Sequence, residues 1–335
     1  MTTSVPQQGE SVFDRIRGQG PAIETLVRAL RARRVHHAYR FEGPPGVGKE
    51  LGAFALAQAL VCTAGGELGC GKCSACHRAV RISEEDPHVP QHPDVVLLGR
   101  GLYPAAALGT ASRETTGIGV EQVRRLVLAR VGFPPHEGRA LVFIVRDAEE
   151  LTQQAANALL KTLEEPPQRT HFVLITSRPN RLLDTIRSRT LPVRFGPLPE
   201  AVVGEILLAH GKSKEHAGAA EGSAELALAL ADEDAARSRS EFVQGALEAT
   251  AAPSLDGAVV FAQTRPNERG DLRQNLLALS HHLAEDARRT LAANASHAAT
   301  SARRYALVVE ALDAIERNGQ PGLALEAMIA RFRNA

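Results

Sequence analysis

The chain has 335 residues, of which 44% are hydrophobic, and a formal net charge of +1. This length allows two or three domains with real cores, and the balanced charge excludes a general electrostatic attraction to nucleic acid. Aromatic residues make up only 4% and tryptophan is absent, which argues against base-stacking surfaces. Residues 1–9 carry no apolar signal-peptide core, and no apolar run reaches the ~20 residues that span a bilayer, so we expect a cytoplasmic protein without membrane contact.

The first predicted elements are a helix within residues 11–37 and a strand over residues 38–41. The helix is indicated by apolar side chains at helical spacing, which are Ile23, Leu26, Val27 and Leu30. His36 and His37 end this segment. Because no cysteine lies near them, we favour a structural role for both over metal binding.

A phosphate-binding loop follows the strand and precedes a helical pattern over residues 51–60. Its residues are Gly43, Pro44, Pro45, Gly46, Val47, Gly48, Lys49 and Glu50. The glycines of such a P-loop let backbone N–H groups surround phosphate oxygens, and its Lys reaches the terminal phosphates. The motif normally ends in Ser or Thr, whose hydroxyl binds Mg²⁺. Glu50 has no hydroxyl, which leaves two alternatives: passive ATP binding without metal, or repulsion of ATP.

All four cysteines of the chain follow that helix within a short segment, with the spacing C-x7-C-x2-C-x2-C. They are Cys62, Cys70, Cys73 and Cys76. In a cytosolic chain such a cluster indicates metal binding more than disulfides, and four thiolates suit a closed structural Zn²⁺ site. An iron–sulfur centre uses similar spacings, but the usual fourth Cys before a Pro is missing from this sequence. Reduced cysteines without a metal are a further alternative.

The next segments alternate between strands and helices. Strands are predicted over residues 92–97, 141–145 and 172–175, with helices around residues 120–127 and over 151–165. A surface loop is predicted between residues 99 and 117. The apolar run Leu141–Val145 is typical of a parallel strand that is buried on both faces. This alternation predicts an α/β fold with a parallel sheet flanked by helices, whereas everything after Pro197 is predicted to be helical, with the last long helix ending at Asn318-Gly319.

The end of the strand at Val145 carries unusual chemistry for a P-loop ATPase. Such enzymes place an Asp there to hold Mg²⁺, followed by a Glu that orients the attacking water. Here the residues are Arg146, Asp147 and Ala148. One alignment puts Arg146 at the metal position, and a shift of one residue puts Asp147 there but Ala148 at the Glu position. In either alignment one part is missing, so hydrolysis within the chain is not expected.

Two further segments invite a functional interpretation. Glu164-Glu165 lies at a helix C-terminus, where the helix dipole disfavours negative charge, although a solvated helix end explains it as well. Ser188-Arg189 follows the last strand. An Arg in such a turn is usually only solvent-exposed, but in a ring of ATPases it can reach the γ-phosphate of a neighbouring subunit.

Together these motifs resemble the bacterial clamp-loader subunits of DNA polymerase III, an AAA+ ATPase-like family, and most closely its delta-prime branch. The resemblance rests on His37-Ala38-Tyr39, the P-loop, the four cysteines, the segment Asn157–Pro167 and Ser188-Arg189, in this order. It implies an AAA+ domain over residues 1–198 with a zinc module at 62–76, a helical lid over 199–240 and an all-α collar over 241–335.

The resemblance also implies a function. Delta-prime subunits are expected to be stator-like members of a hetero-pentameric ring with tau/gamma and delta subunits, which loads the sliding clamp on primed DNA. Arg189 would be the arginine finger given in trans to the tau/gamma ATP site, with Ser188 as its motif partner. Thr190 replaces the family's usual Cys. Glu225 stands where active members carry a nucleotide-sensing Arg, which again disfavours hydrolysis.

Two alternative functions differ in testable features. A tau/gamma-type ATPase is favoured by Lys49 and the intact glycines and disfavoured by Glu50, Arg146 and Glu225. A zinc-knuckle nucleic-acid-binding protein would need a basic, aromatic-bearing knuckle. Residues 62–78 contain Lys72, His77 and Arg78 and no aromatic residue.

Overall fold

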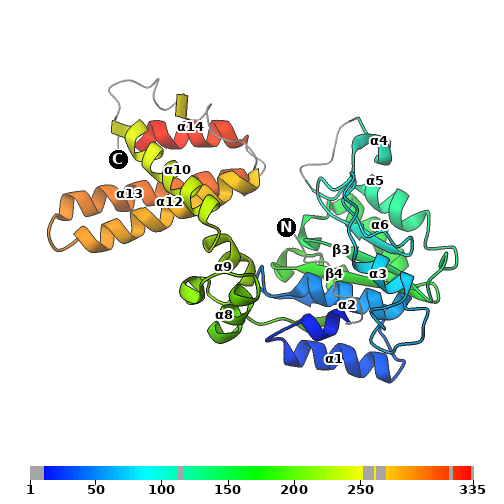
Figure 1. The fold of residues 1–335 in the computed structure, drawn as a ribbon. Coiled ribbons are helices and arrows are strands. Elements are labelled where there is room, and N and C mark those ends of the chain that lie inside the picture. The colour runs from blue at the N-terminus through cyan, green and yellow to red at the C-terminus, as the bar shows by residue number, and fades with distance from the viewer. Residues whose placement is uncertain (1–10, 112–116, 252–259, 262–268, 317–319, 333–335) are drawn as a thin grey trace. The chain divides into compact units, whose positions relative to one another are not determined.

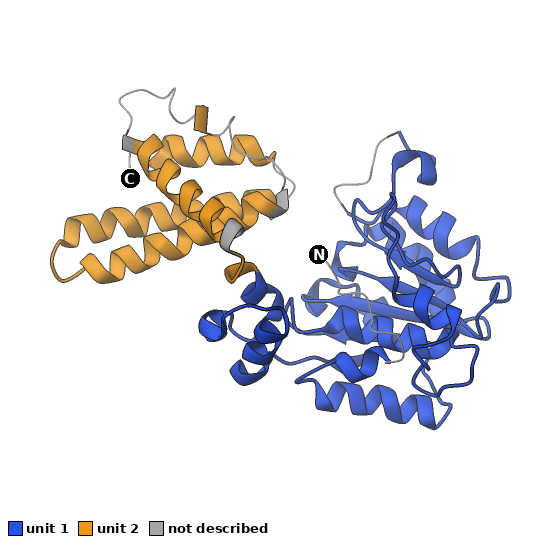
Figure 2. Ribbon diagram, in the orientation of Figure 1, with its two compact units in different colours: residues 1–228 blue, residues 229–335 orange. Residues whose placement is uncertain are grey.

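The computed structural model describes residues 11–111, 117–251, 260–261, 269–316 and 320–332 (Figure 1). The chain divides into two compact units, residues 1–228 and 229–335 (Figure 2). The polar segment 1–9 and the predicted helix end at 318–319 lie outside the described residues. Within the described residues, no helix combines the length and the apolar character needed to cross a membrane.

A five-stranded parallel sheet forms the centre of the first unit, with the strand order β2-β3-β4-β1-β5. The strands are β1 (Ala38–Glu42), β2 (Val95–Leu98), β3 (Leu141–Val145), β4 (Thr170–Thr176) and β5 (Leu191–Arg194). Strand β1 lies between β4 and β5, with Ala38 opposite Phe172 of β4 and Tyr39 opposite Leu191 of β5. The predicted α/β class with a parallel sheet is confirmed.

The sheet is covered on both faces, which explains why its strands read as continuous apolar runs. Alternate residues of β3 enter two different cores: Val142 and Ile144 pack on one face, and Leu141, Phe143 and Val145 on the other. The first core also contains residues of α1 (Gly20–Arg31), α2 (Lys49–Val61) and α3 (Ser74–Val80). The second core contains residues of α6 (Gln153–Glu164), together with Ile118, Val123 and Val127, which precede β3 in the chain.

The remaining helices of this unit are short. They are η1 (Val12–Arg15), α4 (Ala105–Leu108), α5 (Val120–Gln122), η2 (Val123–Leu128), η3 (Ala148–Glu150), η4 (Pro179–Arg181), α7 (Asp184–Arg187), α8 (Glu200–Ala209), η5 (Lys214–His216) and α9 (Ala224–Leu230, which ends just beyond residue 228). The segment predicted as a helix at 120–127 begins as α5 and continues as a π-helix, η2. Residues 11–37 contain one helix, α1, after the 3₁₀ turn η1, in agreement with the predicted helix in this segment. Helix α4 interrupts the predicted loop 99–117.

Among the described strands, β5 is the one that the sequence pattern did not predict. Pro192 lies within it, and a proline is expected to exclude a central strand because it has no N–H to donate. Among the described residues, β5 lies at the edge of the sheet and pairs with β1 alone, and Pro192 is tolerated at such an edge. The start of β5 directly follows the turn that carries Ser188 and Arg189.

The second unit is all-helical, as predicted. Its described helices include α10 (Glu233–Ala251), α12 (Arg269–Thr290), α13 (Ala295–Glu316) and α14 (Pro321–Phe332). They surround a separate core that includes Phe242, Leu276, Val308 and Phe332. The sequence predicted three domains with boundaries at 198/199 and 240/241, whereas the structure divides into two compact units. The three-domain division stays a prediction.

Candidate functional site

The P-loop has the backbone shape of a phosphate cradle. It joins β1 to α2, and Gly43, Gly46 and Gly48 have φ values of 152°, 73° and 98°, which side chains with a Cβ rarely adopt. Gly48 precedes the first residue of α2 in a left-handed conformation. Backbone N–H groups at a helix start of this kind are a ready anion site.

Lys49 is buried, and its ammonium group is turned back onto the loop. Its Nζ donates hydrogen bonds to the carbonyl oxygens of Gly43 at 2.6 Å and Pro44 at 2.5 Å, and to Ser177 Oγ at 3.1 Å. Burial lowers the pKa of Lys49, and the carboxylates of Glu149, Asp147 and Glu225 raise it in part. These three bonds already use the three donors of the ammonium group.

Glu50 and Arg146 form an ion pair at the place where ATPases hold Mg²⁺. Arg146 Nη2 lies 2.5 Å from Glu50 Oε1, and both side chains are more than a third exposed. Arg146 continues the β2–β3 ladder, since its N–H donates to Leu98 O at 2.9 Å. Of the two alignments considered from the sequence, this geometry supports the one that places Arg146 beside the last residue of the P-loop.

Further carboxylates surround the P-loop. Asp147 has φ 47°, and burial, followed by the nearby Glu149 carboxylate, raises its pKa. Glu149 Oε1 accepts the N–H of Ser177 at 3.1 Å. With Glu50 and Glu225, four acidic side chains of the described residues lie near Lys49 and Arg146. A triphosphate would enter a field that does not favour it.

The start of α9 packs directly on the P-loop. The N–H of Ala224 donates to Gly46 O at 3.0 Å. A Cβ on Gly46 would lie 2.1 Å from Ser223 Oγ and 2.7 Å from Glu225 Cβ. Gly46 is therefore required here for close packing as well as for its φ, and Glu225 is held beside the loop.

The four predicted metal ligands converge. The Sγ atoms of Cys62, Cys70, Cys73 and Cys76 all lie within 4.8 Å of one another, and Cys70 Sγ and Cys76 Sγ are 3.8 Å apart. Thiolates about 2.3 Å from a tetrahedral zinc lie about 3.8 Å from each other. Four sulfur donors without an oxygen or water ligand fit a closed, structural zinc site and leave no open position for chemistry.

Backbone N–H donors and burial shift the pKa values of the cysteine thiols in different directions. The N–H groups of Lys72 and Cys73 donate to Cys70 Sγ at 3.4 and 3.3 Å. Burial raises the pKa of Cys73, but the backbone N–H of Cys76 and donors from Thr63 outweigh it and lower the pKa to about 5. Burial raises the pKa of Cys76. Part of the cluster is thus prepared as thiolate, the form that binds metal.

Gln58 connects the cysteine cluster to α2 and was not singled out in the sequence. Its amide donates to Cys76 O at 3.3 Å and accepts the N–H of Val12 at 3.0 Å. Because the amide is buried, both bonds matter for the packing of the module. A polar residue within the apolar pattern of residues 51–60 was the available signal.

Arg189 lies in the turn between α7 and β5. Its Nη2 is 2.5 Å from Glu164 Oε1, and its side chain is 32% exposed. Nη1 donates to Thr185 O at 2.8 Å and to Ser188 Oγ at 3.1 Å, while the Ser188 hydroxyl donates to Thr185 O at 3.1 Å. The guanidinium of Arg189 is therefore held by the residues around it, and Glu164 has a partner that offsets its unfavourable place at a helix end.

Comparison with known proteins agrees with these features. The family model described as "DNA polymerase III, delta subunit" matches residues 18–199, more than half of the chain. The delta' subunit of DNA polymerase III from Bacillus subtilis is 34% identical over 190 residues, which are 56% of this chain and 51% of that protein. The delta' subunit from Escherichia coli is 36% identical over 181 residues, 54% and 48% of the two chains.

Gamma/tau subunits are equally similar. The subunit from Mycobacterium tuberculosis is 37% identical over 196 residues, 58% of this chain and 30% of that protein. The chain thus matches about half or less of the length of these relatives. A gamma subunit-related protein from Thermotoga maritima superposes with a TM-score of 0.47 at 19% identity, over 93% of this chain and 98% of that one. The chain belongs to the clamp-loader family of DNA polymerase III, which includes its delta' and gamma/tau subunits.

Proposed function

We propose that the chain is a delta'-type subunit that hydrolyses no ATP itself and gives Arg189 in trans to the ATP site of a neighbouring tau/gamma subunit. Its partners would be tau/gamma and delta subunits in a pentameric ring, which loads the sliding clamp on primed DNA. Zn²⁺ would be held by the four cysteines in a purely structural role.

The observation that carries this proposal is the ion pair between Glu50 and Arg146. A P-loop ATPase needs a hydroxyl and an Asp at these positions to hold Mg²⁺, which neutralises charge that develops on the phosphates. Here one ligand is replaced by a cation and the other by its counter-ion. A divalent cation would have to approach the positively charged guanidinium of Arg146. The chain would then lack the bound Mg²⁺ that ATP hydrolysis at its own P-loop requires.

The finger assignment is supported by a separate part of the structure. Arg189 is partly exposed, extends from a turn at the sheet edge and has its guanidinium fixed by Thr185, Ser188 and Glu164. A preorganised guanidinium that meets developing negative charge is worth far more than a mobile one. Ser188 supports it through its hydroxyl and need not touch phosphate.

The second candidate is a tau/gamma-type ATPase. It is favoured by the glycine conformations of the P-loop, the position of Lys49 and the 37% identity to a gamma/tau subunit. It would require Mg²⁺ to displace the Glu50–Arg146 pair and ATP to release Lys49 from its carbonyl partners.

ATP turnover separates the two functions. The purified full chain should show no ATP turnover alone. A mixture of tau/gamma, delta, sliding clamp and primed DNA should reach full turnover only after this chain is added. Arg189→Ala should lower the kcat of this mixture by about 10³-fold, because an arginine finger given in trans raises kcat by about that factor or more. The matched control is Arg181→Ala, an exposed arginine of the same β4–β5 connection, which should keep the rate.

Two results would overturn the proposal. Turnover by the chain alone that Lys49→Ala removes would identify an ATPase. An unchanged rate of the complete mixture with Arg189→Ala, while gel filtration shows an intact complex, would refute the finger.

A further inference from the structure

An arginine is buried within the sheet, on the strand β1 that lies between β4 and β5. Arg40 of β1 is 7% exposed, and its Cα lies opposite Leu174 of β4 and Pro192 of β5. A charge in such a place costs several kcal/mol unless it is paired and hydrogen-bonded. The partners of Arg40 therefore show what it does.

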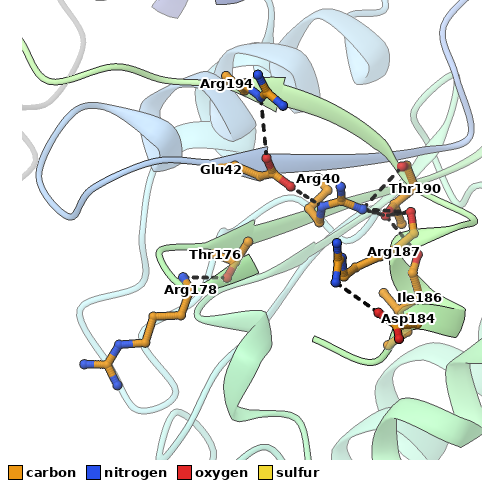
Figure 3. Close-up of polar contacts among 9 residues, drawn as sticks. All are labelled: Arg40, Glu42, Thr176, Arg178, Asp184, Ile186, Arg187, Thr190 and Arg194. Atoms are coloured by element: carbon orange, nitrogen blue, oxygen red, sulfur yellow. Dashed lines mark hydrogen bonds and ion pairs between the residues drawn. The ribbon is translucent and has the colours of Figure 1, made fainter. Parts of the chain in front are cut away.

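Those partners lie in the turn that carries Arg189, together with one carboxylate (Figure 3). Arg40 Nε donates to Glu42 Oε1 at 2.5 Å, on the same strand. Arg40 Nη1 donates to Arg187 O at 2.8 Å and to Thr190 Oγ1 at 2.7 Å, with Thr190 O further away at 3.5 Å. Glu42 thus compensates the charge, and the other edge of the guanidinium holds residues 187 and 190.

Thr190 completes this connection through its buried hydroxyl. The hydroxyl has one proton, which it donates to Ile186 O at 2.9 Å, so it must accept from Arg40 Nη1. The carbonyls of Ile186 and Arg187 lie at the end of the short helix α7, where helical N–H donors run out. Ile186 O accepts the N–H of Arg189 at 3.1 Å as well as the Thr190 hydroxyl, and Arg187 O accepts from Arg40. A Cys at this position, the residue expected from the resemblance, would be a far weaker acceptor.

We propose that Arg40, acting through Thr190 and the carbonyl of Arg187, is a positioning residue for Arg189. This inference rests on the proposed function of Arg189. Residues 188 and 189 lie between the two anchor points, so the turn cannot shift along the sheet edge without breaking hydrogen bonds to a buried charge. In this role Arg40 fixes the backbone from which the Arg189 side chain extends.

The test uses the full chain in the complete clamp-loading mixture. Thr190→Val keeps the shape of the side chain and removes the hydroxyl, and Thr190→Ser keeps the hydroxyl. We expect Thr190→Val to lower kcat by about 10- to 100-fold with the KM for ATP unchanged, since a displacement of about 1 Å can cost about 10²-fold. Thr190→Ser should restore most of the rate. The matched control is Thr170→Val, a similarly buried threonine at the amino end of β4.

A second variant and a double mutant keep the test decisive. Arg40→Lys retains the charge next to Glu42 but loses the planar fork, so it should slow turnover as Thr190→Val does. In an Arg189→Ala background, Thr190→Val should cause no further loss, because both changes act on the same group.

Three outcomes distinguish the positioning role of Arg40 from the finger role of Arg189. A loss in Thr190→Val that disappears in the Arg189→Ala background supports the positioning role. Full activity of both Thr190→Val and Arg40→Lys, while Arg189→Ala is slow, refutes the positioning role and leaves the finger in place. Full activity of Arg189→Ala refutes the finger and this inference with it.

Discussion

At the scale of single residues, Glu50 and Arg146 come from segments 96 positions apart in the chain and compensate each other's charge. Each alone would be a defect in a P-loop: a carboxylate beside phosphates, or a guanidinium in place of a metal ligand. Together they make an ion pair whose net charge is zero. Exposed pairs of this kind contribute about 0–1 kcal/mol, so this pair adds little to the stability of the fold.

Restoring both metal ligands should restore metal-dependent nucleotide binding. We expect Glu50→Thr with Arg146→Asp to bind ATP more tightly in the presence of Mg²⁺ than in EDTA, because a hydroxyl and a carboxylate then face the cation. Fluorescent-nucleotide titration measures this effect, and adding Lys49→Ala should abolish the binding. Metal-dependent binding of the same strength by the unaltered chain would contradict the account of the ion pair.

The convergence of the four cysteines could be predicted from sequence, because they lie in one short segment. The P-loop glycines likewise lie within one turn, so their positive φ values needed no knowledge of the rest of the fold. The contacts of Arg40 with Thr190 join positions 150 apart. Only a strand order that places β1 beside β5 brings them together, and β5 was not predicted.

At the scale of elements, β3 and β5 show what pattern can and cannot predict. The run Leu141–Val145 matches β3 residue for residue, because a strand buried on both faces must be apolar throughout. β5 exposes three of its four residues and contains a proline, so nothing in it reads as a strand until its pairing with β1 is known. The π-helix η2 gave no sequence signal that we can identify.

Asp286 joins two helices of the second unit. From α12 it accepts hydrogen bonds from Ser301 Oγ and His297 Nε2 of α13, both at 2.7 Å, and lies 3.0 Å from Arg289 Nη2. The Ser301 hydroxyl, followed by Arg289 and His297, lowers the pKa of Asp286 to about 2. A carboxyl group with a lowered pKa stabilises the fold above its unfolded pKa of about 3.9, and this stabilisation is lost as the pH falls toward 2.

Asp286→Asn should therefore weaken the α12–α13 pair by about 1–2 kcal/mol at neutral pH. The difference from the unaltered chain should not fall between pH 8 and 5 and should shrink only below about pH 4. Hydrogen-exchange protection of α12 and α13 measures local opening in a chain of two units. Glu285→Gln, its exposed neighbour on α12, is the control; a difference that fades between pH 8 and 6 would contradict the role of the carboxylate.

At the scale of the whole molecule, the three described cores do not cross the boundary between the two units. The two cores of the sheet draw their buried residues from positions 12 to 195, and the helical core from positions 242 to 332. Each unit therefore holds the apolar burial that dominates its stability.

A chain that ends after Ala231 should fold and retain zinc, because both sheet cores and all four cysteines are present. If the helical second unit closes the ring, as the resemblance implies, the fragment should fail to join tau/gamma and delta. Zinc analysis, thermal unfolding by circular dichroism and gel filtration measure these properties. Cys73→Ala in the same fragment should lose the metal. An unfolded fragment would show that the sheet cores need the second unit.

The ion pair between Glu50 and Arg146 also limits what single substitutions can do at this place. A hydroxyl at position 50 alone would leave the guanidinium of Arg146 facing an incoming cation. Asp at position 146 alone would place two carboxylates side by side, which attract a divalent cation but repel the phosphates of a nucleotide. Only the two changes together give a hydroxyl and a carboxylate that face the same cation, so each position restricts what the other can become.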